Sequence, residues 1–278
     1  MKLIKFKSIK ARVLVWIVVT TLLALGLLTG FIYWRISNTV GGMLEENTTE
    51  LVESRASQIG EWINTLKKET DILAMTNVIK SMDMEDAADY LETRRDGISD
   101  SVETLFVVEP GGRGMTAKGN EVELSQREYV QKIFAGAEHA ISNPVISAAT
   151  GNPIFVIAQA IKDDFGETTG IMGITVTLKT ISEIAGEINV GGKGYGFIID
   201  GSGLVIAHQE SELVMDMNVL ESSAQGFKGL EEAGAKMVRG EKGLTEIETP
   251  DGLRELIVYT PIPNTPEWSL GVAVNVAN

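Results

Sequence analysis

Arg127 is the residue of this sequence whose type and surroundings best suit the binding of a small molecule. Ser125, followed three residues later by Glu128, has the spacing of a capping box, which predicts a helix over about residues 125–134 with Arg127 in its first turn. A guanidinium there offers a planar fork of donors, and the free amides and dipole of a helix start would add positive potential. These features favour contact with a carboxylate. The alternative is a solvated surface arginine, the commoner place for this residue type.

The other polar motifs do not form a recognisable catalytic or metal site. Residues 191–196 lack the Gly-Lys-Ser/Thr ending of a phosphate-binding loop, and residues 200–203 lack the spaced oxygen ligands of an EF-hand, so both indicate turns. His139 and His208 are the only histidines and the chain has no cysteine, which excludes thiolate metal sites and cysteine nucleophiles. Ser202 is not in a Gly-x-Ser-x-Gly elbow. We therefore expect no catalytic residue, no metal, no cofactor and no enzymatic activity.

The N-terminal segment has the pattern of a membrane anchor. Residues 13–34 carry no charge, and a helix of this length would measure about 33 Å, enough to cross the hydrocarbon core. The segment before it is basic and contains no acidic residue, which predicts a cytoplasmic N-terminus, with residues 36–278 outside the cytoplasm at the cell inner or plasma membrane. The alternative is a cleaved signal peptide, but its apolar region would be shorter and would end in small residues, whereas residues 31–34 read Phe-Ile-Tyr-Trp.

The charge balance makes some partners improbable on physical grounds. Residues 1–35 contain six of the 24 basic residues and none of the 38 acidic ones, which leaves a formal charge of −20 on the remainder. Such a surface repels phosphate backbones. We therefore expect no nucleic-acid partner.

A long amphipathic helix is predicted after the membrane segment. Apolar residues recur there at helical spacing, and they are Leu44, Leu51, Val52, Ile59, Ile63, Leu66 and Leu73. The pattern predicts a helix that runs to about Met75. Its apolar stripe can pack on its own domain or form a seam between two copies, and the second interpretation predicts a homodimer.

From residue 104 the chain changes to short apolar runs separated by glycine, which predict β-strands and tight turns. Three runs recur in the same order at offsets of 91, 101 and 98 residues: 106–109 and 197–200, 156–161 and 257–262, and 170–176 and 268–274. We therefore predict two copies of an α+β unit. The predicted helices of these units cover residues 125–134, 178–188 and 224–238.

The order of these motifs resembles the double Cache domain of prokaryotic receptors, over about residues 36–278. The residues that carry the resemblance are Arg127-Glu-Tyr129, Gly136, Val145-Ile-Ser147, Thr150-Gly151-Asn-Pro153, Ala160-Ile161, Gly170 to Gly173, and Gly196-Phe-Ile-Ile-Asp-Gly-Ser-Gly-Leu-Val-Ile-Ala-His208. The resemblance implies an α+β fold with an N-terminal transmembrane helix, a long stalk helix and two tandem PAS-like antiparallel-sheet modules. The implied segments are a cytoplasmic N-terminus (1–12), a transmembrane helix (13–34), a stalk and connecting helical segment (36–100), a membrane-distal ligand-binding module (101–188) and a membrane-proximal module (189–278).

The resemblance also implies a ligand site in the distal module, formed by Arg127, Tyr129, Ser147, Phe155 and Thr175. Amino-acid-binding members of the family commonly carry an aspartate at the position of Thr175, and a tyrosine or aspartate at that of Ser147. An ammonium buried without a countercharge is costly, whereas hydroxyls can serve a carboxylate or a neutral group. We therefore expect a small organic acid or an uncharged metabolite, with an amino acid as the alternative.

The first ten residues look like the start of a methyl-accepting chemotaxis protein, and the chain stops where such receptors usually place a second transmembrane helix. We therefore expect the sensing region of a truncated chemoreceptor, which binds a small molecule in its distal module and signals across the membrane. Histidine kinases and diguanylate cyclases bear the same ectodomain and are the first alternative. An anchored extracytoplasmic enzyme and an adhesion module are alternatives from other classes.

Overall fold

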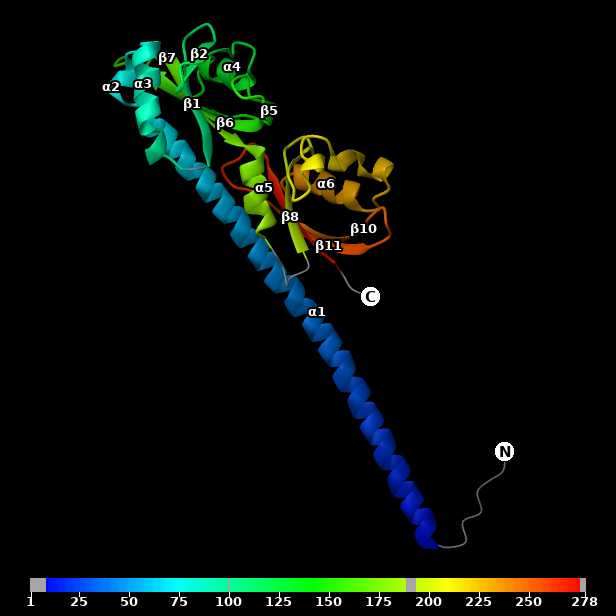
Figure 1. Ribbon diagram of the computed structural model, residues 1–278. Helices are drawn as coiled ribbons and strands as arrows, with labels where there is room; N and C mark the ends of the chain where they lie inside the picture. The colour runs from blue at the N-terminus through cyan, green and yellow to red at the C-terminus, as the bar shows by residue number, and fades with distance from the viewer. Residues whose placement is uncertain (1–8, 100, 189–193, 276–278) are drawn as a thin grey trace. The chain divides into compact units, whose positions relative to one another are not determined.

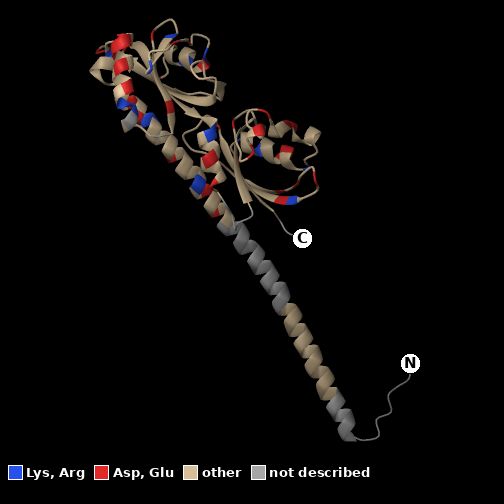
Figure 2. Ribbon diagram, viewed as in Figure 1, with Lys and Arg blue, Asp and Glu red and all other residues tan. Residues whose placement is uncertain are grey.

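The computed structural model describes residues 9–99, 101–188 and 194–275, without the side chains of residues 9–15, 32–47 and 96. Part of the predicted cytoplasmic segment, the glycines of residues 191–193 and the side chain of Leu44 therefore lie outside the described residues. The chain divides into two units, residues 1–48 and residues 49–278. Figure 2 shows acidic residues at many places along the ribbon of the second unit, in keeping with the acidic composition.

Helix α1 (Ile9–Ala74) begins in the first unit and continues into the second (Figure 1). In the described part of the chain, which includes the side chains of residues 16–31 of this helix, no helix combines the length and apolarity needed to cross a membrane. Within the second unit, Val52, Ile59, Ile63 and Leu66 are each 2% exposed or less. Their spacing places them on one face of the helix, so the predicted stripe packs on its own domain.

The remaining helices are short and belong to the second unit. They are α2 (Asn77–Lys80), α3 (Met84–Arg94), α4 (Glu128–Phe134), α5 (Leu178–Gly186) and α6 (Leu230–Val238), with 3-10 helices η1 (Arg95–Gly97), η2 (Ser211–Leu213) and η3 (Val219–Gln225). The helix predicted over residues 224–238 is in fact two segments, because Gly226 and Gly229 take left-handed backbone angles that no helix accommodates.

The first sheet is antiparallel, with strand order β3-β2-β1-β7-β6-β4, and β5 also pairs with β6. Its strands are β1 (Val102–Val108), β2 (Arg113–Thr116), β3 (Glu121–Glu123), β4 (His139–Ile141), β5 (Val145–Ile146), β6 (Pro153–Lys162) and β7 (Thr168–Thr177). Both faces of β6 and β7 are buried, which explains the nearly continuous apolar runs in their sequences.

The second sheet is also antiparallel, with the order β10-β11-β12-β8-β9. Its strands are β8 (Gly194–Ile199), β9 (Val205–Ala207), β10 (Gly243–Glu248), β11 (Arg254–Pro261) and β12 (Ser269–Asn275). The run β2-β1-β7-β6 of the first sheet has the same connectivity as β9-β8-β12-β11 of the second. The molecule is therefore an α+β protein with a long N-terminal helix and two similar antiparallel sheets.

A phenylalanine opposite a glycine recurs at the same place in both sheets. Phe106 pairs with Gly173 between β1 and β7, and Phe197 pairs with Gly271 between β8 and β12. A Cβ atom added to either glycine would collide with the opposing ring. The ring thus covers the glycine backbone, and the pair fixes which residues of the two sheets are equivalent.

Buried side chains form three clusters. The largest, which we call the shared core, combines residues of α1, α5 and both sheets, including Ile63, Leu105, Phe155, Trp268 and Leu270. A second cluster lies between the first sheet and α4, and a third lies between the second sheet and the segment that contains η3 and α6. Each sheet therefore has one face in the shared core and one face toward its own short helices.

Candidate ligand-binding site

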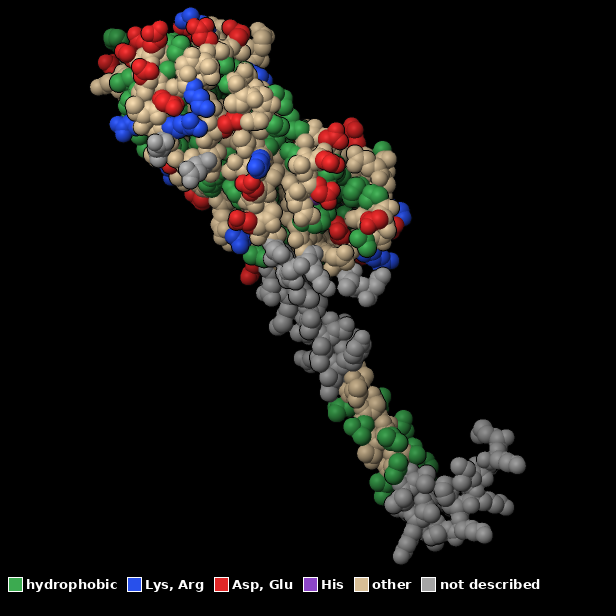
Figure 3. Space-filling view, in the orientation of Figure 1, with side chains coloured by type: hydrophobic (Ala, Val, Ile, Leu, Met, Phe, Trp, Pro, Cys, Tyr) green, Lys and Arg blue, Asp and Glu red, His purple; other side chains and the backbone are tan. Residues whose placement is uncertain are grey.

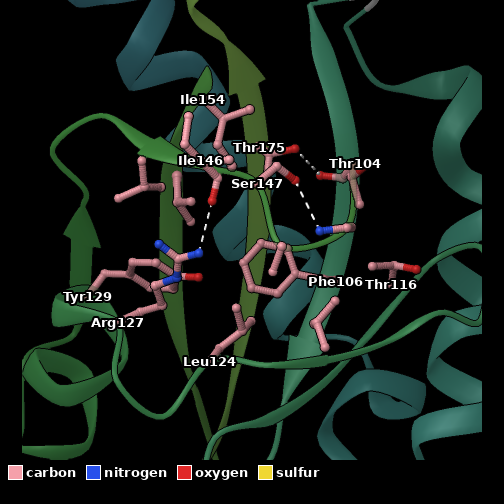
Figure 4. A pocket seen from close by; sticks show the side chains of 15 residues that line it. Thr104, Phe106, Thr116, Leu124, Arg127, Tyr129, Ile146, Ser147, Ile154 and Thr175 are labelled. Carbon is pink, nitrogen blue, oxygen red and sulfur yellow. Dashed lines mark hydrogen bonds between the residues drawn. The ribbon is translucent and has the colours of Figure 1, made fainter. Parts of the chain in front are cut away.

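A pocket lies between the first sheet and α4, on the face of the sheet opposite to the shared core (Figure 4). Its floor is made by Thr104 and Phe106 of β1, Ile154 and Val156 of β6, and Thr175 of β7. The start of α4 forms one wall, and β5 with the turn that follows it forms another. Because side chains alternate along a strand, this face collects every second residue of the three central strands.

Arg127 lies at the pocket as the residue that precedes helix α4. Its backbone is extended (φ −77°, ψ 130°), and Ser125 makes no side-chain capping bond, so the predicted capping box does not form and the helix starts at Glu128. Its Nη2 donates to the carbonyl oxygen of Ile146 at 2.9 Å (Figure 4). Among the described residues, the Arg127 guanidinium has no carboxylate partner. A positive charge with unused donors therefore faces the pocket.

Tyr129 lines the same pocket as Arg127. Two residues two positions apart on an ideal helix would point to different faces, but Arg127 precedes the helix and has an extended backbone, so this helical separation does not apply. The Tyr129 ring is 4% exposed and meets Phe106 edge to face, with centroids 6.4 Å apart. Its hydroxyl makes no hydrogen bond with any described residue. Burial raises the pKa of Tyr129 to about 12, although the charge of Arg127 opposes the shift. Tyr129 is thus a neutral donor at physiological pH.

Ser147 and Thr175 are buried polar residues that also line the pocket. The Ser147 hydroxyl oxygen accepts from the backbone amides of Ala149 and Thr150, at 3.3 and 3.2 Å, and so shapes the turn after β5. The Thr175 hydroxyl lies 3.4 Å from the carbonyl oxygen of Thr104. Both side chains serve the protein's own structure and keep capacity for a further hydrogen bond.

Phe155 does not line this pocket, which corrects its predicted place. It lies between Ile154 and Val156, which do line the pocket, and strand alternation turns it to the opposite face. There it is fully buried in the shared core, with its ring 5.1 Å from that of Trp268 and nearly perpendicular to it. The structure thus brings Arg127, Tyr129, Ser147 and Thr175 together, and places Phe155 directly behind them.

Glu103 is a polar neighbour of the site that sequence reasoning missed. It is the extra residue of a β-bulge, since Val102 and Thr104 pair with the successive residues Val176 and Thr175. The bulge brings one Glu103 carboxylate oxygen to 3.4 Å from the Thr175 hydroxyl. Its other oxygen accepts from the Thr150 hydroxyl and the Asn152 amide, at 3.0 and 2.6 Å. Nothing in a single sequence signals a bulge at this position, and strand alternation alone would turn Glu103 away.

The free space inside the pocket is about 30 Å³, room for little more than one water molecule. A larger ligand requires one wall to move. The wall formed by β5 and the following turn is held to α4 by the bond between Arg127 and the Ile146 carbonyl, and to β1 by the bonds of Glu103. Strand β5 of this wall is also paired with β6, so a ligand would have to replace the polar side-chain contacts and shift the wall against this strand pairing. Among the described residues, no group of three or more acidic or histidine side chains is placed to hold a metal ion.

Tyr129 predicts how stability depends on alkaline pH. The pKa of the group is higher in the folded protein (about 12) than its ordinary value of 10.0, so between these values the unfolded chain loses a proton that the folded chain keeps. The free energy of unfolding should therefore fall as pH rises through this range. Between about pH 9 and about pH 11.5, the free energy of unfolding should fall by roughly 2 kcal/mol less in Tyr129→Phe than in the wild type, because the variant has no phenol to titrate. Urea denaturation at a series of pH values measures both slopes. A wild-type slope in this variant would contradict the burial of the hydroxyl.

Comparison with known proteins places the fold. The profile of the dCache_1 family, a Cache domain, matches residues 35–278. The methyl-accepting chemotaxis protein McpA of Pseudomonas putida is 24% identical over 262 residues, which cover 91% of this chain and 38% of that protein. The chain therefore spans well under half the length of this curated relative.

Solved structures agree with this match. The ligand-binding domain of the Pseudomonas fluorescens chemoreceptor CtaA, in complex with L-isoleucine, superposes with a TM-score of 0.69 at 21% identity, covering 86% of this chain and 94% of that one. The extracellular domain of mmHK1S-Z2, described as a histidine kinase, superposes with a TM-score of 0.67 at 17% identity, covering 83% and 96%. At these identities the likeness establishes the fold.

Proposed function

This chain belongs to the double Cache (dCache_1) family, and from that premise we propose that it is the ligand-sensing region of a transmembrane chemoreceptor of the methyl-accepting type. The proposed ligand is a small molecule that carries a carboxylate and binds beside Arg127 in the distal module, residues 101–188. No catalytic residue, cofactor or nucleic-acid partner is part of the proposal.

One observation carries the choice of ligand: the guanidinium of Arg127 faces the pocket with a single neutral partner among the described residues, the carbonyl oxygen of Ile146. A carboxylate is a better partner than a carbonyl, because it is charged and can accept two parallel hydrogen bonds from the guanidinium fork. The ligand carboxylate would take the place of the Ile146 carbonyl, and the wall that contains Ile146 would move outward. The free hydroxyl of Tyr129 would supply a further donor.

Glu103 bears on whether the ligand also carries an ammonium group. The absence of an acidic residue at position 175 favours an organic acid, as the sequence suggests. Glu103, however, reaches the Thr175 hydroxyl and could supply a negative charge at that end of the pocket. CtaA was crystallised with L-isoleucine, which carries both charges. An organic acid and an amino acid are therefore the two forms of the proposal, and the experiment below separates them.

A route for the signal follows from strand β6. Ile154 and Val156 face the ligand pocket, while Phe155 between them meets Trp268 at the entry to β12 of the second sheet. A ligand that shifts β6 therefore changes a packed contact with the proximal module, residues 189–278. Such a change transmits a signal only if the ligand binds the two signalling states with different affinity.

The membrane location is part of the same proposal. The uncharged run of residues 13–34 would tether the chain, with residues 36–278 outside the cytoplasm, and the described apolar side chains Trp16, Leu22 and Leu27 are exposed as such a role requires. The proposed assembly is a homodimer. The same sensor attached to a histidine kinase is the second candidate, because the extracellular domain of mmHK1S-Z2 has this fold.

The test is a thermal-shift screen of the full chain in detergent against organic acids and amino acids, each compared with its own carboxamide, in which the carboxylate charge is removed. We expect the free carboxylates to raise the melting temperature and the amides to lose the effect, because a ligand that binds only the native state stabilises it by mass action. Equal shifts from acid and amide would contradict the carboxylate proposal. Shifts from L-leucine but not from 4-methylpentanoate, which lacks the ammonium, would select the amino-acid form, and their loss in Glu103→Gln would then assign Glu103 as the partner of the ammonium.

A further inference from the structure

The second sheet has a cavity at the position equivalent to the distal pocket. Aligning the two sheets on the pairs Phe106–Gly173 and Phe197–Gly271 also aligns the residues that form the floor of each cavity. The equivalent residues are Thr104 and Tyr195, Phe106 and Phe197, Ile154 and Glu255, and Val156 and Ile257. The duplicated fold therefore builds a second cavity from the same strand positions.

This cavity, which we call the proximal cavity, is the roomier of the two. Its free volume is about 280 Å³, compared with about 30 Å³ for the distal pocket. That value is close to the lower end, ~300 Å³, of the range for small-molecule sites. The cavity lies between the second sheet and the segment that carries η3 and α6, and Figure 3 shows apolar and acidic side chains together on the face where α6, β10 and β11 lie.

Glu255 is the residue that sets the chemistry of the proximal cavity. Its side chain replaces the apolar Ile154 of the distal pocket and is 7% exposed. One carboxylate oxygen, Oε2, accepts from the Tyr195 hydroxyl at 3.0 Å, and the other accepts no hydrogen bond from the described residues. Burial raises the pKa of the Glu255 carboxyl and nearby Asp251 raises it further, whereas the hydrogen bond from Tyr195 lowers it. This second oxygen is not one of the buried unpartnered atoms of the described structure, so it is open to the cavity and can accept a hydrogen bond from a cationic group.

The rest of the lining carries negative charge and aromatic rings. Glu210 and Asp251 are further carboxylates of the cavity, and none of its lining residues, all of which are described, is a lysine or arginine. His208 supplies no positive charge, because burial lowers its pKa and its Nδ1 accepts from the backbone amide of Glu210 at 2.9 Å, which places the ring proton on Nε2. Phe197 and Phe227 add apolar walls.

We propose that the proximal cavity binds a small organic cation, whose ammonium group is held by Glu255 and enclosed by the aromatic rings around it. A carboxylate with one free oxygen accepts a hydrogen bond from an ammonium that carries N–H groups and attracts a quaternary ammonium by charge alone, and aromatic faces attract both kinds of cation. The two modules then carry cavities of opposite charge preference on one scaffold, with Arg127 at the distal site and Glu255 at the proximal site. This site is separate from the distal pocket, so neither proposal depends on the other.

The test is isothermal titration calorimetry of the full chain in detergent with butylammonium and choline, and with 1-butanol as the uncharged match. We expect both cations to bind saturably and butanol not to bind. Glu255→Gln keeps the shape and the acceptor for Tyr195 but removes the charge, and should weaken cation binding at least about tenfold. Glu231→Gln, which removes the same charge from the exposed face of α6 outside the cavity, should leave the affinity unchanged.

Several results would overturn the proposal. Absence of saturable binding by both cations would do so, as would equal affinity for butanol, or a Glu231→Gln effect as large as that of Glu255→Gln. If Glu255→Gln does not fold, Asp251→Asn, on the exposed rim of the cavity, tests the proposal in its place. We expect this variant to lose at least about threefold in affinity for the cations, less than Glu255→Gln, since a partly solvated charge pair contributes less than a buried one. Wild-type affinity in that variant, or in a folded Glu255→Gln protein, would contradict the role of the acidic cavity.

Discussion

Replacing Arg127 by alanine should weaken binding of a carboxylate ligand by about a hundredfold, because hydrogen bonds to a charged group are worth ~1.5–3 kcal/mol each. Arg127→Lys keeps the charge but loses the planar fork, so we expect an intermediate loss of roughly tenfold. Calorimetric titration with the strongest carboxylate from the thermal-shift screen measures both losses. The free energy of unfolding without ligand should change by less than about 1 kcal/mol, because the only side-chain hydrogen bond that Arg127 makes in the described structure is to the Ile146 carbonyl.

Arg113→Ala is the matched control for this experiment. Arg113 lies on β2 of the sheet that forms the pocket floor and carries the same charge, but it forms an exposed ion pair with Glu109 at 2.9 Å and does not line the pocket. Its removal tests whether a loss of affinity follows from the general charge of the module. Equal losses in the Arg113 and Arg127 variants, or an unchanged affinity in Arg127→Ala, would show that the guanidinium at the pocket does not hold the ligand.

Trp268→Ala should lower the free energy of unfolding by about 3–5 kcal/mol, the loss typical of removing a buried tryptophan ring. Trp268 is fully buried in the shared core and packs edge to face on Phe155 of the first sheet. Its removal leaves a cavity where the two sheets meet, so the loss of stability should be accompanied by weaker coupling between the modules. Denaturant unfolding of the full chain, followed by circular dichroism, measures the first effect.

Two variants control the interpretation of the Trp268 result. Trp268→Phe should lower the free energy of unfolding less than Trp268→Ala does. It retains part of the ring volume and removes an indole Nε1 that has no hydrogen-bond partner among the described residues. Trp62→Ala removes a tryptophan that also meets Phe155 edge to face, at 6.4 Å between centroids, but is only partly buried, so its loss should be smaller. A loss below about 1 kcal/mol for Trp268→Ala would mean that the shared core does not depend on this ring.

Arg127 illustrates what local sequence information could and could not predict at the site. Its type predicted a carboxylate contact, and the structure places its guanidinium at a pocket, with no carboxylate partner in the described part of the chain. The predicted capping box was wrong, because Ser125 and Glu128 do not bond across a helix start and Arg127 itself precedes the helix. Local spacing gives only a tendency to start a helix at a given residue. Tertiary contacts, such as the bond from Arg127 to the Ile146 carbonyl, decide whether Arg127 lies in the first helical turn or before the helix.

The sequence by itself determined the repeated architecture, because the spacing of apolar residues and the order of the strand-like runs can be read along the chain without knowledge of tertiary contacts. The stripe Val52, Ile59, Ile63 and Leu66 predicted an apolar face of α1, which is buried, and the recurring runs predicted two copies of an α+β unit, which form two sheets of matching connectivity. Only the tertiary structure decided which face of a strand meets which partner. Phe155 lies in the shared core and not in the pocket, because side chains alternate between the two faces of β6, and a β-bulge places Glu103 beside Thr175. The acidic cavity at Glu255 likewise exists only in the folded second module, because it joins strands and loops that are far apart in the chain.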